Sequence, residues 1–165
     1  MSAATTAQPG AQDEHFVTAV LALAQHSRDS GHHPFAAMVV AADGTVIAQA
    51  MNASSQDRTA HAEMNALRLA SSQYGPAQLA GATLYSSAEP CAMCAGATYW
   101  SGVGRVVYAL SEAGLLALTG SDPENPTLAL PCRQVFASGQ RPTEVIGPLR
   151  ETEAAVAHEG FWHKS

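Results

Sequence analysis

The sequence predicts an α/β fold in which helices cover both faces of a mixed β-sheet. An Asp43-Gly44 pair lies between two short apolar runs within residues 32–50, which is a strong signal for a β-hairpin. Beyond the hairpin, apolar segments typical of strands alternate with segments of helical periodicity as far as the C-terminus. The antiparallel hairpin and the later alternation together make the sheet mixed. A length of 165 residues suits one domain.

Two helices are predicted in the first half of the chain. The first is expected to begin near Asp13, because the apolar residues that follow share one broad helical face. The second covers residues 59–73, with Thr59 as its N-cap and with Leu67 and Leu69 directed toward the core. Each helix then has an apolar face to pack against the sheet.

The second half of the chain alternates between strands and helices. Pro90 suits the first turn of a helix, whereas Pro131 interrupts a helical pattern and leaves the start of that helix open. In order, the predicted elements are a strand at 81–87, a helix at 91–100, a strand at 104–110, a loop at 119–127, a helix within 127–137, a fifth strand or extended segment at 143–149 and a last helix at 150–162.

Composition and charge narrow the function classes. The chain is 47% hydrophobic and 13% charged, which is typical of a globular protein and not of a disordered one. Its net charge of −6, with eight Lys and Arg, offers no cluster of cations for phosphates, so a nucleic-acid partner is not expected. No apolar run reaches about 18 residues and the first residues lack a secretory pattern, so we expect no membrane span and a cytoplasmic location. Residues 1–12 predict a flexible tail and residues 13–165 a single domain.

Four residues in two short motifs point to a metal. Cys91 and Cys94 are three apart, so on a helix they share one face, and the positive end of the helix dipole favours their thiolates. His61 and Glu63 are two apart and diverge along the side of a helix. They reach a common point only if the helix aims its N-terminal end at that point. The sequence therefore predicts that two helix N-termini converge on one site.

The ligand types indicate a catalytic zinc. Two thiolates and one imidazole leave the fourth position of a tetrahedral Zn²⁺ open for water, and a zinc ion lowers the pKa of that water. Glu63 beside the metal is then a candidate to move the proton of the water. Such a site suits the addition of hydroxide to an electron-poor carbon.

The cysteine and histidine residues of the sequence allow three other interpretations. The Cys-x-x-Cys pair could be a redox couple, although the His-x-Glu helix upstream argues against it. A closed structural zinc would need a fourth ligand, for which Cys132 and His158 are the candidates, yet Cys132 lies in an apolar stretch typical of a buried core residue. His32 and His33 precede a strand and are expected to be polar residues of the surface or of a loop.

The H-A-E motif followed by P-C-x-x-C resembles the signature of zinc-dependent nucleobase deaminases. From about Phe16 to Ala109 the chain is similar to the cytidine-deaminase-like superfamily, in the branch that contains bacterial guanine deaminases, cytosine deaminases and tRNA adenosine deaminases. The resemblance implies a three-layer α/β/α fold with a five-stranded mixed sheet and a homodimer. It also implies one Zn²⁺ per chain, and the residues that it assigns are Glu63 as proton shuttle and His61, Cys91 and Cys94 as zinc ligands.

The resemblance also suggests residues that bind the substrate. Phe35 matches a position where an aromatic ring stacks on a base, or it is a core residue at a strand start. Asn52 matches an asparagine that holds the base by its amide, or it is a turn residue. The backbone of Ala62 could donate to a ring carbonyl. Ser87 and Glu89 could offer their backbone carbonyls to the leaving amine. Trp100 could contact a fused ring, or it is a core residue at a helix end.

The expected function is hydrolytic deamination of a free purine base, with guanine converted to xanthine and ammonia. Cytosine, an aminotriazine, guanosine or another nucleoside, and a tRNA adenosine remain alternative substrates. A non-catalytic zinc-binding or RNA-binding module on the same fold is the alternative from another class, and Glu63 argues against it because a scaffold needs no carboxylate beside its metal. The aromatic residues Phe161 and Trp162 suggest that the C-terminal segment closes the pocket as a lid, or that it simply docks there.

Overall fold

The computed structural model describes residues 7–162, and these form one five-stranded mixed sheet. The strands are β1 (Ala36–Val40), β2 (Val46–Met51), β3 (Thr83–Ala88), β4 (Arg105–Leu110) and β5 (Glu144–Ile146). Their order in the sheet is β2-β1-β3-β4-β5. Strand β1 runs antiparallel to both of its neighbours, whereas β3, β4 and β5 are parallel. The predicted hairpin and the predicted mixed sheet are confirmed.

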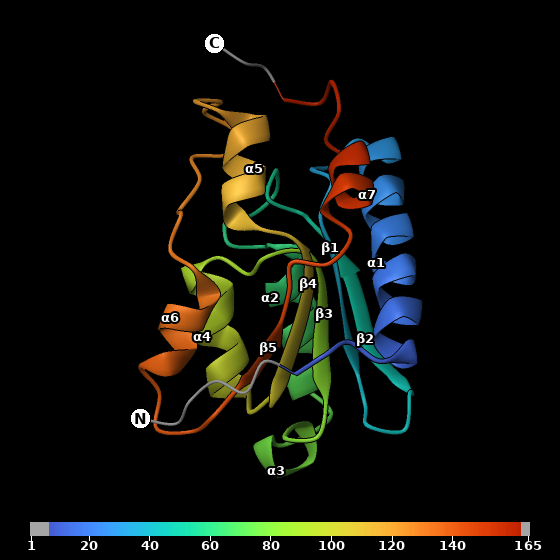
Figure 1. Ribbon diagram of the computed structural model, residues 1–165, viewed down its shortest axis with the longest axis vertical. Coiled ribbons are helices and arrows are strands. Elements are labelled where there is room, and N and C mark those ends of the chain that lie inside the picture. The colour runs from blue at the N-terminus through green and yellow to red at the C-terminus, as the bar shows by residue number, and fades with distance from the viewer. Residues whose placement is uncertain (1–6, 163–165) are drawn as a thin grey trace.

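Helices pack on both faces of this sheet. They are α1 (Ala11–Asp29), α2 (Ala62–Ser71), α3 (Pro76–Leu79), α4 (Ala92–Ser101), α5 (Glu112–Thr119), α6 (Cys132–Ala137) and α7 (Glu151–Val156). Figure 1 shows α4 and α6 on one side of the strands and α1 on the other. One core cluster joins α2, α4 and α6 to one face of the sheet, and a second joins α1, α5 and α7 to the opposite face. The three-layer α/β/α prediction is therefore confirmed.

The two cores follow from the alternation of side chains along each strand. Leu84 and Val106 lie in the core on the α2 side, and the next residues, Tyr85 and Val107, lie in the core on the α1 side. All four are fully buried. This alternation decides which strand residues can face the functional site and which can only face α1.

The first helix is fixed to the sheet by a buried carboxylate. Asp13 accepts hydrogen bonds from the backbone N–H of Gly10 at 2.8 Å and from the hydroxyl of Tyr85 at 2.8 Å. It also forms a two-point ion pair with Arg105, with N–O distances of 2.6 and 2.8 Å. The hydrogen bonds from Arg105, helped by those from Gly10 and Tyr85, hold the pKa of Asp13 at about 2, against an ordinary value of 3.8. Strands β3 and β4 are thereby tied to the N-terminal end of α1.

Several boundaries differ from the sequence predictions. Helix α1 begins at Ala11, so the last two residues of the predicted tail are helical, whereas residues 1–6 lie outside the described residues. Thr59 is not the N-cap of α2, because it donates to Asp57 in a turn and the helix begins only at Ala62. Leu69 is 49% exposed and lies on the solvent side of α2.

The C-terminal third departs further from the predictions. Pro131 precedes α6 and acts as its N-cap residue, so only the last part of the predicted 127–137 helix forms. The last helix ends at Val156, six residues earlier than predicted, and turns follow it. Helix α5 was not predicted; Ser111 caps it by accepting the N–H of Gly114 at 3.0 Å. Among the described residues, no helix is both long and apolar enough to cross a membrane.

Candidate functional site

Two of the predicted metal ligands occupy equivalent places at the starts of two helices. His61 is the N-cap residue of α2 and Cys91 is the N-cap residue of α4, and both have extended backbone angles. Neither side chain makes a capping hydrogen bond, so each is free to turn toward the other helix. Glu63 and Cys94 follow within the first turn of the respective helices. The predicted convergence of two helix N-termini is confirmed.

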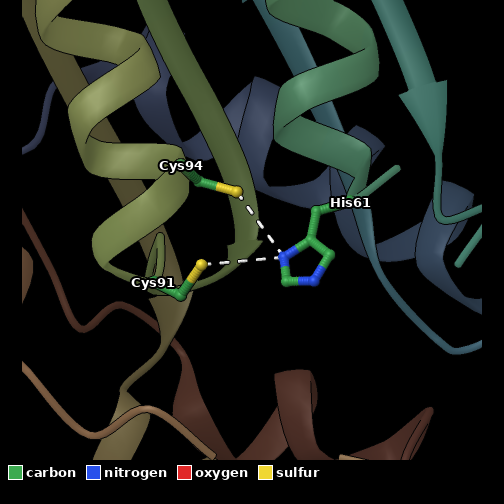
Figure 2. A group of neighbouring side chains, drawn as sticks. All are labelled: His61, Cys91 and Cys94. Atoms are coloured by element: carbon green, nitrogen blue, oxygen red, sulfur yellow. Dashed lines mark hydrogen bonds between the residues drawn. The ribbon is translucent and has the colours of Figure 1, made fainter. Parts of the chain in front are cut away.

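The three candidate ligands meet at one point (Figure 2). The Sγ atoms of Cys91 and Cys94 each lie 3.6 Å from Nδ1 of His61, and all three ligand atoms are within 4.8 Å of one another. A tetrahedral Zn²⁺ at its usual bond lengths separates a nitrogen ligand from a sulfur ligand by about 3.6 Å. The donor set and its spacing therefore fit a zinc ion.

The electrostatics of the site favour a thiolate. A hydrogen bond from Cys94, followed in size by one from His61, lowers the pKa of the Cys91 thiol to about 4, although burial opposes this effect. The thiolate is the form that binds a metal. Cys91 is therefore prepared as a ligand before an ion arrives.

Glu63 is the buried carboxyl group next to this cluster. Its Oε1 accepts a hydrogen bond of 2.8 Å from the hydroxyl of Ser86, on strand β3. Its Oε2 lies 3.6 Å from Sγ of Cys94. Only 6% of Glu63 is exposed, and burial raises the pKa of its carboxyl above the ordinary value. A carboxyl group with a raised pKa is better suited to taking and returning a proton than one at its ordinary pKa.

A cavity of about 340 Å³ lies beside the ligand cluster. Two of the ligands, His61 and Cys91, line it together with Glu63, and helix α5 contributes Glu112 and Leu115. The remaining lining residues are His33, Phe35, Asn52, Ser54, Arg58, Ala88, Glu89, Met93, Glu124, Asn125, Pro126, Thr127 and Leu128. The cavity is at the lower end of the range for small-molecule sites, about 300–1,000 Å³.

Two of the five predicted substrate-binding residues line this cavity. Phe35 and Asn52 both lie in its wall, and Asn52 is only 5% exposed. The side-chain oxygen of Asn52 accepts both the N–H of Ser54 at 2.9 Å and its hydroxyl at 2.7 Å. These contacts orient the amide, so the NH₂ group of Asn52 is the part left to donate to a ligand.

The other three predicted residues do not line the cavity. Trp100 is 82% exposed and lies near the C-terminal end of α4, whereas Cys91 stands at the start of that helix. The hydroxyl of Ser87 accepts the N–H of Ala36 at 3.0 Å, in a buried contact between strand ends. Ala62 is fully buried in the core between α2 and the sheet, so any contact with a ligand is limited to its backbone.

Two acidic residues of the wall are Glu89, to which the sequence assigned only a backbone role, and Glu112, which sequence reasoning missed. Each follows the carboxyl end of one of the neighbouring parallel strands β3 and β4, the edge where ligands bind in such sheets. That position was the available signal. Glu89 accepts the N–H of Glu112 at 2.9 Å through Oε2 and the N–H of Cys132 at 2.8 Å through Oε1. It therefore ties the starts of α5 and α6 to the strand end that leads into the Cys-x-x-Cys motif.

The C-terminal segment packs behind the cavity wall. His33, expected to be a surface or loop residue, lines the cavity, and its ring contacts Phe161 and Trp162 at centroid distances of 5.8 and 5.0 Å. The indole N–H of Trp162 donates to Nδ1 of His158 at 3.0 Å, so His158 is engaged away from the metal cluster. None of residues 158–162 lines the cavity itself. The segment thus supports the wall from outside.

Comparison with known proteins places this site in a family. Residues 11–110 match the cytidine and deoxycytidylate deaminase zinc-binding region. A probable cytosine deaminase of Schizosaccharomyces pombe is 38% identical over 152 residues, which cover 92% of this chain and 93% of that protein. A solved guanine deaminase from Nitrosomonas europaea has a TM-score of 0.72 at 27% identity and covers 94% of this chain and 94% of that chain. A tRNA-specific adenosine deaminase of Bacillus subtilis is 39% identical over 99 residues, 59% of this chain and 61% of that protein.

The matched region contains both motifs, and the metal expected from the ligand types is the metal of the matched family. The matches to the Schizosaccharomyces pombe and Nitrosomonas europaea proteins extend along almost the whole length of each protein. The chain therefore belongs to the cytidine and deoxycytidylate deaminase zinc-binding family and is a hydrolytic deaminase.

Proposed function

We propose that this deaminase acts on a free nucleobase, guanine before others, and releases xanthine and ammonia. The observation that carries the free-base assignment is the cavity beside the metal ligands, which is small and has carboxyl groups of Glu63, Glu89 and Glu112 in its wall. A phosphate group would find one guanidinium there, that of Arg58, beside four acidic side chains that include Glu124. The choice of guanine rests on the likeness to the guanine deaminase from Nitrosomonas europaea over nearly the whole chain.

In this proposal each residue has a defined task. His61, Cys91 and Cys94 hold the zinc ion, which when bound supplies the Lewis acidity that lowers the pKa of water. Ser86 holds Oε1 of Glu63, which leaves Oε2 to take the proton of the attacking water. Glu63 then gives this proton to a ring nitrogen of the substrate. It next takes the proton of the hydroxyl group added to the ring carbon and gives it to the departing amine, so that the C–N bond breaks as the carbonyl forms.

Two further residues orient the base. The NH₂ group of Asn52 donates to an acceptor atom on the ring, because its carbonyl oxygen is already engaged by Ser54. The ring of Phe35 offers an apolar surface for the flat base. Both groups belong to the wall of a rigid sheet end, which suits a small ligand that must be held in one orientation.

Cytosine is the second candidate, favoured by the probable cytosine deaminase of Schizosaccharomyces pombe. The deciding experiment measures ammonia release from guanine, cytosine, guanosine, an aminotriazine and a tRNA substrate at equal concentration, with Glu63→Gln as the matched inactive variant. The variant should keep its zinc and lose at least about 10²–10⁴-fold in turnover, since an amide cannot shuttle protons. Faster release from cytosine or tRNA than from guanine would overturn the guanine assignment.

A further inference from the structure

Glu112 has a backbone position that is fixed from both sides. It is the first residue of α5, and its N–H donates to Oε2 of Glu89 at 2.9 Å. The preceding residue, Ser111, donates its N–H at 2.9 Å and its hydroxyl at 2.6 Å to Oε1 of Glu151. Two carboxylates from different parts of the chain therefore hold this helix start. The side chain of Glu112 begins from a rigid point at the cavity wall.

The carboxyl group of Glu112 opens onto the cavity and accepts no hydrogen bond from the described residues. Only 6% of the residue is exposed, and it lines the cavity together with Glu63 and Cys91. Within residues 7–162, no donor forms a hydrogen bond with this carboxyl group, whereas Glu63 is bonded to Ser86 and Glu89 to two backbone N–H groups. A carboxyl group that is fixed at a cavity wall and bonded to no other side chain is available to a ligand, and a ligand that fills the cavity must supply its hydrogen bond.

We propose that Glu112 contacts the substrate and selects it, by accepting a hydrogen bond from an N–H group of the base. This inference rests on the proposed function, because it assumes a nucleobase in the cavity. Asn52 presents a donor and Glu112 an acceptor, both in the wall of the same cavity. A free base carries ring acceptors and ring N–H groups together, so it can satisfy both. A base whose N–H is blocked leaves the carboxyl group of Glu112 unpaired.

The test combines substrate analogues with two variants. Glu112→Met keeps the length of the side chain and removes the acceptor, and Glu112→Gln keeps an acceptor oxygen. kcat/KM for ammonia release is measured with guanine and with 1-, 7- and 9-methylguanine. The wild type should disfavour one of the three analogues by roughly 10- to 100-fold, the usual loss when a polar group enclosed by a ligand is left unpaired. Glu112→Met should lose about that factor on guanine and no longer discriminate against that analogue, and Glu112→Gln should retain part of the discrimination.

Stability separates this role from a structural one. If Glu112 is kept for the ligand, both variants should bind as much zinc as the wild type and melt at the same or a higher temperature. Glu14→Ala, which removes an exposed carboxylate of α1, is the control for loss of one charge. Equal analogue preferences in the wild type and in Glu112→Met would overturn the proposal. A wild type that accepts all three analogues as well as guanine would also overturn it, even if a variant fails to fold.

The test of Glu112 as a selecting residue can be separated from the test of guanine as the substrate. If the wild type releases ammonia from cytosine and not from guanine, the guanine assignment fails. The same comparison with cytosine and 1-methylcytosine then decides the role of Glu112. A preference that depends on Glu112 supports the residue assignment in either case, and a preference independent of Glu112 refutes it.

Discussion

Replacing Asp13 by Asn should weaken the fold at neutral pH and leave the pocket unchanged. Asp13 is 3% exposed and receives hydrogen bonds from Gly10, Tyr85 and Arg105. These contacts lie on the α1 side of the sheet, whereas the metal ligands lie at the starts of α2 and α4. The substitution keeps the shape of the side chain and removes its charge.

The magnitude follows from the pKa of Asp13, which is about 2 in the folded protein against an ordinary value of 3.8. At about 1.4 kcal/mol for a tenfold change, this difference corresponds to about 2 kcal/mol of stability. Because the folded pKa is the lower one, the stabilisation is fully present above about pH 4 and is lost as the pH falls through about 2. For a chain of this size the loss lowers Tm by about 4–8 °C.

The assay is urea unfolding, followed by tryptophan fluorescence, of the wild type and Asp13→Asn at pH 7 and pH 3. The difference in unfolding free energy between the two proteins should be about 2 kcal/mol at pH 7 and about half of that at pH 3. Loss of metal in acid cancels in this difference, since both proteins keep the same metal ligands. Glu153→Gln, which removes an exposed carboxylate paired with Arg150, should change little. The reasoning would be refuted if the wild type and Asp13→Asn had equal unfolding free energies at pH 7. It would also be refuted if the difference between them were the same at pH 7 and pH 3.

The remaining predictions concern the metal, the C-terminal segment and the assembly. The purified protein should hold about one zinc ion per chain and Cys91→Ser should lose most of it; full occupancy in that variant by metal analysis would remove Cys91 from the ligand set. Trp162→Ala should raise KM for the base while retaining zinc, because Trp162 packs against His33 in the cavity wall; an unchanged KM would show that this segment does not shape the pocket. We expect a homodimer, and Trp100→Asp should weaken it in sedimentation experiments, because Trp100 is a large exposed aromatic residue; a wild type that sediments as a monomer would refute this.

The metal cluster could be predicted from the sequence because short-range geometry determines it. The three-residue spacing of Cys91 and Cys94, and the two-residue spacing of His61 and Glu63, each restrict how a helix can present the pair. The same helix geometry shows that Trp100 cannot contact a base bound at the metal. It lies nine residues after Cys91, and a helix rises about 1.5 Å per residue, so its position is more than about 13 Å from the ligand. Strand alternation likewise places Ser86, and not Ser87, on the side of Glu63.

The cavity wall could not be predicted in the same way. Residues 120–131 form no helix or strand, and five of them, 124–128, line the cavity. Their position depends on contacts with residues distant in the sequence, such as the hydrogen bond between Glu89 and Cys132. The ring contacts of His33 with Phe161 and Trp162 join segments more than a hundred positions apart. Periodicity carries no information about such contacts, so the sequence predicts His33 only as a polar residue of the surface or of a loop, and not as part of the cavity wall.

The tie made by Glu89 has a consequence for how such a protein can diverge. The metal ligands stand on helices packed into the core, whereas much of the cavity wall belongs to the segment from Glu112 to Leu128. Substitutions along that segment can change the shape offered to a ligand and leave the chemistry intact, so substrate range can drift while catalysis is retained. Glu89 is the exception, since it contacts the starts of α5 and α6 and stands two residues before Cys91. A substitution of Glu89 would disturb both the substrate pocket and the metal-binding helix start. We therefore expect libraries of active variants to tolerate substitution far less at Glu89 than in the segment from Glu112 to Leu128.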